Sequence, residues 1–209
     1  MVDLDQSLPS YLRNFNVTNE LLQFKSRKLL ENAVRRTNAN VSYTVPIRFR
    51  RIELYNNAPC TVNFLDSVAS PATFTLRCKD DKQVFLSNFQ GSDDGKVYTA
   101  SFHDIVQTPI GNIVVQPNTN FNPSWYGVDI LVSKQHINSS VGFYQGNISI
   151  DPQRQSTVMV VSARDYSSRR ASDLLHALVE AYNEEAINDK NQISINTAAF
   201  IDERIQIIG

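Results

Sequence analysis

The sequence has 209 residues, a length that suits one large domain or two small ones. Hydrophobic residues make up 42% and charged residues 20%, with seven glycines and eight prolines, which excludes collagen-like, purely coiled-coil and strongly disordered proteins. Lysine and arginine total 20 against 21 acidic residues, so the net charge of -1 gives no general attraction to nucleic acid or to an anionic membrane.

Neither a membrane span nor a signal peptide is evident in the sequence. No run of about 18 apolar residues occurs, and the first residues lack the basic-then-apolar order of a signal peptide. We therefore expect this segment to direct neither membrane insertion nor export by itself. We expect either a cytosolic protein or a piece of a longer one.

The first regular element predicted is a helix from Thr18 to about Thr37, with Thr18 as its N-cap. Ser26 is expected on its apolar face, where the hydroxyl would bond back to the preceding turn. The apolar positions at helical spacing are Leu22, Leu29, Leu30, Ala33 and Val34.

Short β-rich runs separated by turn residues follow from Val41 to about Ile150, a pattern typical of an antiparallel or mixed sheet. Turn-prone residues at 79–82 predict a hairpin, and Thr-Pro-Ile-Gly at 108–111 predicts another turn. The later run STVMVVSA is apolar enough to predict a central strand buried on both faces. The earlier runs are VSYTV, RRIELY, TVNFLD, ATFTLRC, KQVFLSNF, KVYTASF, NIVVQP, GVDILVS and NISI.

The C-terminal segment predicts one long helix. No Gly or Pro occurs between Pro152 and Gly209, and an apolar face can be followed to Ile208. From Ser168 this helix would contain about 41 residues and extend roughly 60 Å. Such length without an internal cap indicates a coiled coil or a helix that continues elsewhere. We expect any break to lie at about 188–191.

Together these elements predict an α/β fold: a mixed, mainly antiparallel sheet packed by helices, with a long C-terminal helix. Residues 1–167 would form the N-terminal helix and the β-rich body. Residues 168–209 would form a helical segment of the same domain. We expect the first and last helices to back the sheet.

The sequence shows no recognisable catalytic, cofactor or metal site. The three histidines, His103, His136 and His176, match neither a zinc-binding spacing nor a Ser-His-Asp order. No Gly-rich phosphate-binding loop occurs, so ATP chemistry within these residues is not expected. We predict a non-catalytic segment without a cofactor or a metal ion.

The two cysteines, Cys60 and Cys78, are too few for a disulfide framework or a zinc site. Each lies in a strand-like run, so adjacent strands could bring them together as a disulfide. Two reduced thiols in the core are the alternative, because sequence alone does not give the separation that a bridge requires.

Charge is distributed unevenly along the chain. Residues 25–51 contain eight basic residues and one acidic residue, a balance of +7, and residues 180–204 contain two basic and six acidic residues, a balance of -4. The two regions either neutralise each other within the fold, meet between neighbouring copies, or serve to bind an acidic polymer. The candidates for self-association are Arg48, Arg50, Arg51, Glu184, Glu185 and Asp189.

Several segments resemble the periplasmic domain of polysaccharide co-polymerases, the Wzz-like chain-length determinants that include capsule-exporting bacterial tyrosine kinases. The similar segments are LLQFKSRKLLENAV followed by VSYTV, RRIELYNNAPCTVNF, TPIGNIVV and, most specifically, the run from STVMVVSARDYSS to AAFIDERI. In that last run His176 stands where the family pattern has Asn. The resemblance covers most of the chain.

The resemblance implies a periplasmic α/β domain of a bacterial inner-membrane protein that regulates the chain length and export of capsular or exopolysaccharide. It implies a homo-oligomeric ring that works with the polysaccharide polymerase and export machinery. Attachment to the membrane would occur only through segments outside this sequence, and a parent of the kinase type would carry a separate cytoplasmic tyrosine kinase domain. This segment would then contain no catalytic residue.

A second function from another class is a carbohydrate-binding β domain that holds the polysaccharide directly. Such a domain needs exposed aromatic side chains on which sugar rings pack. Trp125 and Tyr126 are the adjacent aromatic residues that we consider for this role, and both could instead belong to the core.

Overall fold

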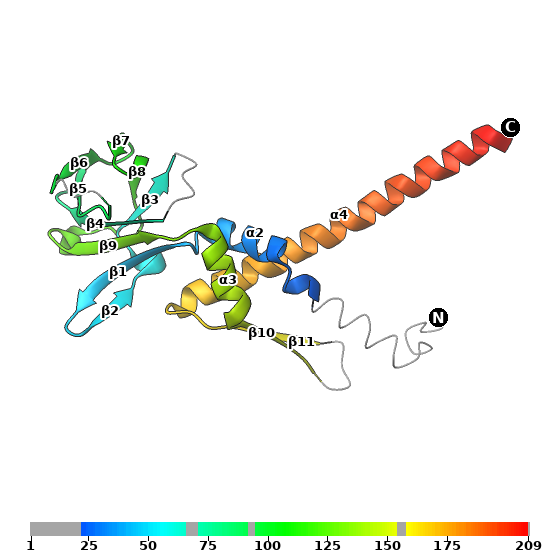
Figure 1. Cartoon of the computed structure of the whole chain (residues 1–209), viewed down its shortest axis with the longest axis horizontal. Coiled ribbons are helices and arrows are strands. Elements are labelled where there is room, and N and C mark those ends of the chain that lie inside the picture. Colours follow the sequence, from blue (N-terminus) through cyan, green and yellow to red (C-terminus); the bar gives the residue numbers. More distant parts are fainter. Residues whose placement is uncertain (1–21, 66–70, 92–94, 154–157, 209) are drawn as a thin grey trace.

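The computed structural model describes residues 22–65, 71–91, 95–153 and 158–208. A β-rich body lies at one end, shorter helices lie beside it, and one long helix extends away to the C-terminus (Figure 1). The predicted fold class is confirmed, since the strands pair antiparallel and a long helix ends the chain.

The larger sheet of the body has six strands in the order β2-β1-β9-β4-β5-β6. The expected hairpin at 79–82 joins β4 to β5, and the Asp80 carboxylate accepts hydrogen bonds from the backbone N–H groups of Lys82 and Gln83. The six strands are β1 (Val41–Ile47), β2 (Arg50–Glu53), β4 (Ala72–Cys78), β5 (Gln83–Ser87), β6 (Tyr98–Ser101) and β9 (Asp129–Lys134).

A three-stranded sheet packs against the larger one, and the first hydrophobic core lies between them. It consists of β3 (Cys60–Phe64), β8 (Gly111–Pro117) and β7 (Ile105–Thr108). The expected turn at 108–111 closes the β7–β8 hairpin, where Gly111 adopts a positive φ of 102°. Fully buried side chains of this core include Phe74, Leu76, Val84, Ile113 and Ile130.

The helices form a second core. Helices α2 (Arg27–Thr37), α3 (Ile137–Asn147) and the first half of α4 (Ser168–Ile208) pack together with the hairpin of β10 (Ile148–Pro152) and β11 (Met159–Ala163). Buried there are Leu30, Val34, Val141, Leu174 and Leu178. We expected the first and last helices to back the sheet, but they pack mainly on each other, because the three-stranded sheet already covers the sheet's apolar face.

The first predicted helix is interrupted where we expected it to continue. Residues 22–24 are helical, but α2 begins at Arg27 with Ser26 as its N-cap, whose Oγ accepts a hydrogen bond from the Leu29 N–H at 3.3 Å. A serine side chain satisfies a free N–H at a helix start better than it suits the interior of a helix. The expected N-cap, Thr18, lies outside the described residues.

The expectation of a central strand at STVMVVSA is wrong. Its described part forms β11 (Met159–Ala163), which pairs only with β10 among the described strands, and Val160 is exposed. Met159 and Val161 pack on the helical core while the other face meets solvent. The prediction failed because both faces of this ribbon carry apolar residues, which gives it the same composition as a strand buried on both faces.

Helix α3 was not predicted from the sequence. It contains two glycines and two adjacent serines, all poor helix formers, at 142, 146, 139 and 140. The helix is held by packing instead, because Val141 and Tyr144 are buried in the helical core. Tertiary contacts therefore override a weak local preference at this point.

Helix α4 is continuous from Ser168 to Ile208, 41 residues, which confirms the predicted long helix, and no break occurs at 188–191. Its first half is buried through Leu174 and Leu178, whereas every described side chain from Ile187 to Ile205 is exposed. None of the described helices combines the length and the apolar character needed to cross a membrane.

Candidate functional site

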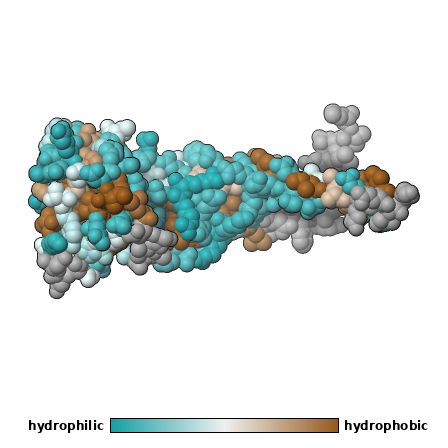
Figure 2. All heavy atoms as spheres, turned by 90° about the horizontal axis from the view of Figure 1, so that it is seen from above, coloured by the Kyte–Doolittle hydropathy of each residue, from teal (hydrophilic) through white to brown (hydrophobic). Residues whose placement is uncertain are grey.

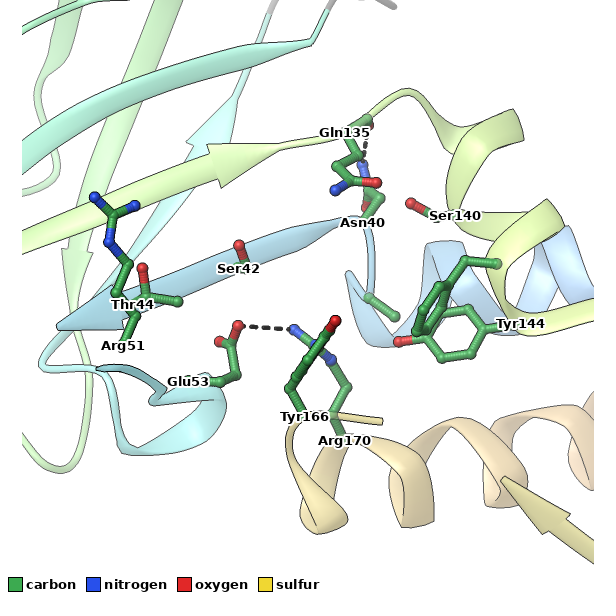
Figure 3. Close-up of a pocket in the computed structure, with 12 residues that line it drawn as sticks. Asn40, Ser42, Thr44, Arg51, Glu53, Gln135, Ser140, Tyr144, Tyr166 and Arg170 are labelled. Atoms are coloured by element: carbon green, nitrogen blue, oxygen red, sulfur yellow. Dashed lines mark hydrogen bonds and ion pairs between the residues drawn. The ribbon is translucent and has the colours of Figure 1, made fainter. Parts of the chain in front are cut away.

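A pocket of about 330 Å³ lies where the β body meets the helices (Figure 3). One wall comes from β1 and β2 of the six-stranded sheet. The opposite wall comes from α3 and from the segment that leads into α4. The pocket is therefore built only when the two cores come together.

Strand alternation explains the polar wall on the sheet. The residues of β1 that face the body core are Val41, Tyr43 and Val45. Successive side chains of a strand point to opposite faces, so Ser42 and Thr44 point toward the helices. Thr44 pairs with Glu53 of β2, which places the Glu53 carboxylate on the same face.

Arg170 in the first turn of α4 joins the helices to the sheet. Its Nη1 lies 3.2 Å from Oε2 of Glu53, and its Nη2 lies 2.7 Å from Oδ1 of Asp165. Asp165 also accepts hydrogen bonds from the Tyr144 hydroxyl and from the backbone N–H of Ser167. Since the side chains of Arg170, Glu53 and Asp165 are at most 6% exposed, these charges interact away from bulk water.

The ionisation of this cluster follows from burial and its hydrogen bonds. Burial raises the pKa of Asp165, but hydrogen bonds from Arg170, Tyr144 and Ser167 outweigh it and hold the pKa below its usual value. Burial lowers the pKa of Arg170, but Asp165 and Glu53 outweigh it and the net shift is upward. Burial and Asp165 raise the pKa of Tyr144. At neutral pH Asp165 and Arg170 are charged and Tyr144 is neutral.

The cluster is suited to holding the start of α4 against the sheet. Both oxygens of Glu53 are engaged, one by Arg170 and one by the backbone N–H groups of Tyr43 and Tyr55. Within the described ranges, no group of three or more His, Cys, Asp or Glu side chains is placed to hold a metal ion. The chemistry that the pocket offers a ligand is therefore that of hydroxyls, amides and aromatic rings along its walls.

Two of the residues predicted for self-association form ion pairs within the chain. Glu184 pairs with Arg36, and Glu185 lies 2.5 Å from the Lys28 ammonium. The two oppositely charged regions thus neutralise each other in part within the fold, which is one of the three interpretations above. The other four candidates, all exposed and joined by no ion pair among the described residues, are Arg48, Arg50, Arg51 and Asp189.

Association between copies through the exposed arginines remains a prediction. We expect weak self-association at high protein concentration in low salt, because exposed charge pairs contribute about 0–1 kcal/mol each. Salt screens such pairs over about 8 Å at physiological strength, so association should decrease as salt rises. Sedimentation of the wild type and of a variant with Arg48, Arg50 and Arg51 changed to Glu measures this. Reversal of Lys79 and Lys82 is the control, and association unaffected by salt and by the arginine reversal would contradict it.

Cys60 and Cys78 face each other across the core between the two sheets. Their Sγ atoms are 3.7 Å apart, and both are buried free thiols. They belong to β3 and β4, which lie in different sheets, rather than to adjacent strands. The structure therefore brings the predicted pair together in the reduced form.

One feature of the sequence points to the charged cluster of the pocket. Arg169 and Arg170 occupy the first turn of α4, where the helix dipole disfavours a cation. An arginine in that position needs a nearby carboxylate, and Asp165 lies five residues earlier. The serines and amides of the pocket carry no comparable signal, because such residues are common on any surface.

The adjacent aromatic residues predicted for sugar binding are divided by the fold. Trp125 packs against the body core, whereas Tyr126 is exposed and lies beside Phe121. The pair therefore offers one ring rather than a continuous platform.

No family model matches this sequence, and no curated protein matches it significantly.

Proposed function

We propose that the chain is the periplasmic, non-catalytic domain of a bacterial inner-membrane protein that regulates the chain length and export of capsular or exopolysaccharide. In this proposal, copies associate side by side in a ring and work with the polymerase and export machinery. The sequence segments described above resemble the Wzz-like chain-length determinants. The structural observation that supports the proposal best is the exposed apolar face in the distal half of α4.

The distal half of α4 carries large apolar side chains into solvent. Ile187, Ile193, Phe200, Ile201 and Ile205 are 50–65% exposed. Figure 2 shows hydrophobic residues along this extended part of the molecule, between hydrophilic ones. Helices in proteins gain most of their stability by packing an apolar face. This face has no partner among the described residues, so we infer that another chain covers it.

A second copy of the chain suits this face. Acidic and basic residues occur beside it on the same helix, namely Asp189, Lys190, Asp202 and Arg204. Helices that carry both signs beside an apolar stripe can pair with copies of themselves, because each acidic group finds a basic group on the neighbour. A ring of identical chains uses such contacts repeatedly.

The proposed function predicts a change in polymer length in the bacterium that encodes the chain. Changing Ile193 and Ile201 to Glu places charges on the apolar face of α4, so side-by-side association should fail. We expect the surface polysaccharide, separated by gel electrophoresis, to lose its preferred length distribution. Deletion of the coding sequence should have the same effect.

The matched control changes Asn188 to Asp and Gln192 to Glu, which adds the same charge to the side of the helix away from Ile193 and Ile201. This variant should restore the wild-type length distribution to the deletion strain. An unchanged distribution after deletion would contradict the proposed function. Equal behaviour of the two charged variants would contradict the role of the apolar face.

A further inference from the structure

The pocket between the body and the helices contains a buried hydroxyl group that has no hydrogen-bond partner among the described residues. Ser140 is 4% exposed, lines the pocket from α3, and its side chain makes no hydrogen bond to another described residue. In Figure 3 its hydroxyl points to the side of Asn40 and Gln135, across the pocket. Buried hydroxyls are normally hydrogen-bonded, so this group is available to bind water or a ligand.

The facing wall offers further groups of the same kind. The side chains of Ser42, Thr44 and Gln135 line the pocket and make no hydrogen bond within the described part of the chain. Each hydroxyl or amide both donates and accepts hydrogen bonds. The pocket therefore matches a ligand whose own groups also do both, such as an alcohol with several hydroxyls.

Two aromatic rings stand at the pocket. The side chains of Tyr166 and Phe143 line the pocket and are 86% and 39% exposed, although aromatic side chains are usually more buried. Exposed rings beside a polar pocket offer an apolar surface to one face of a ligand. A ligand that suits both features has an apolar C–H face and hydroxyl groups at its edge.

The charges around the pocket balance. Two guanidinium groups, those of Arg51 and Arg170, are matched by the carboxylates of Glu53 and Asp165. No single sign of charge dominates, so the site has little preference for an ion. Its volume of about 330 Å³ is near the lower end of ligand pockets, which measure about 300–1,000 Å³.

From these features we propose that the pocket binds one uncharged sugar ring. The C–H face of the ring packs on Tyr166 or Phe143, and its hydroxyls take the place of water at Ser140, Ser42 and Thr44. The pocket does not depend on the apolar face of α4. A failure to bind sugar would therefore not contradict the proposed ring assembly. A failure to assemble would not contradict sugar binding in the pocket.

The test is a titration of the ¹⁵N-labelled protein with glucose, galactose, mannose and N-acetylglucosamine, followed by amide chemical shifts. We expect saturable shifts at Ser140, Tyr144 and Tyr166 with at least one sugar at millimolar concentration. Ser140→Ala and Tyr166→Ala should each weaken binding by about three- to tenfold, the usual effect of one hydrogen bond or one ring contact.

Tyr126→Ala removes an exposed tyrosine that does not line the pocket and should leave binding unchanged. Inorganic phosphate tests the charge argument and should cause no saturable shift at these amides. The proposal would be overturned if no sugar shifted them, if phosphate alone did, or if both pocket variants bound sugar like the wild type.

Discussion

Arg170→Met is expected to lower the free energy of unfolding by about 3–5 kcal/mol, the usual result of removing one partner from a buried ion pair. Methionine retains much of the side-chain volume but leaves the carboxylates of Asp165 and Glu53 buried without a cation. Urea unfolding followed by circular dichroism measures the change. An unchanged midpoint would show that solvent reaches these carboxylates.

The matched control is Arg169→Met at the neighbouring exposed position in the same helical turn. We expect a change of about 0.5 kcal/mol or less there, as for most surface substitutions. Adding Asp165→Asn to Arg170→Met should recover part of the loss, because the uncompensated charge disappears with it. Full additivity of the two changes would contradict a direct interaction.

The deficit of Arg170→Met should also depend on pH. In the wild type the pKa of Asp165 is depressed, so its contribution is present above the unfolded pKa of about 3.9 and is lost as pH falls through the lower folded value. Without Arg170, burial is expected to raise the folded pKa above the unfolded one. The deficit should then be largest at neutral pH and shrink toward about pH 4. A deficit that is constant over this range would contradict the assignment.

Oxidation of Cys60 and Cys78 to a disulfide should raise the free energy of unfolding by about 3 kcal/mol. The cysteines are separated by 18 positions, and a bridge over such a loop restricts the unfolded chain. Their Sγ atoms must close from 3.7 Å to about 2.05 Å, which requires a small shift of the two sheets. Copper phenanthroline treatment, mass measurement after thiol alkylation and urea unfolding provide the measurement.

Reaction at this pair should be slow at neutral pH. Both thiols are buried, which keeps an oxidant in solution away from them. The contact with Cys78 and burial raise the pKa of Cys60, whereas the hydrogen bond with Cys60 lowers the pKa of Cys78, so any thiolate of the pair forms at Cys78. Cys60→Ala treated in the same way is the control and should show no added stability from oxidant. If both thiols could still be alkylated once the oxidised wild type was unfolded in urea, the expected bridge would be contradicted.

Elements that depend on local pattern could be predicted from the sequence. The long helix from Ser168 is predicted correctly because helical spacing of apolar residues continues without Gly or Pro. The hairpin at 79–82 is predicted correctly because Asp80 satisfies backbone N–H groups within its own turn. In each case the stabilising groups lie within a few residues of one another.

Tertiary structure decided the elements whose stability comes from distant parts of the chain. Helix α3 forms from poor helix formers because other elements bury Tyr144 and Val141. Strand β11 forms a two-stranded ribbon with β10, and one face of this ribbon packs on the helical core. The pocket likewise requires Glu53 of β2 and Arg170 of α4, which are 117 positions apart, to meet across the two cores. Local sequence pattern does not predict this contact, because the contact depends on how the sheet and the helices pack against each other.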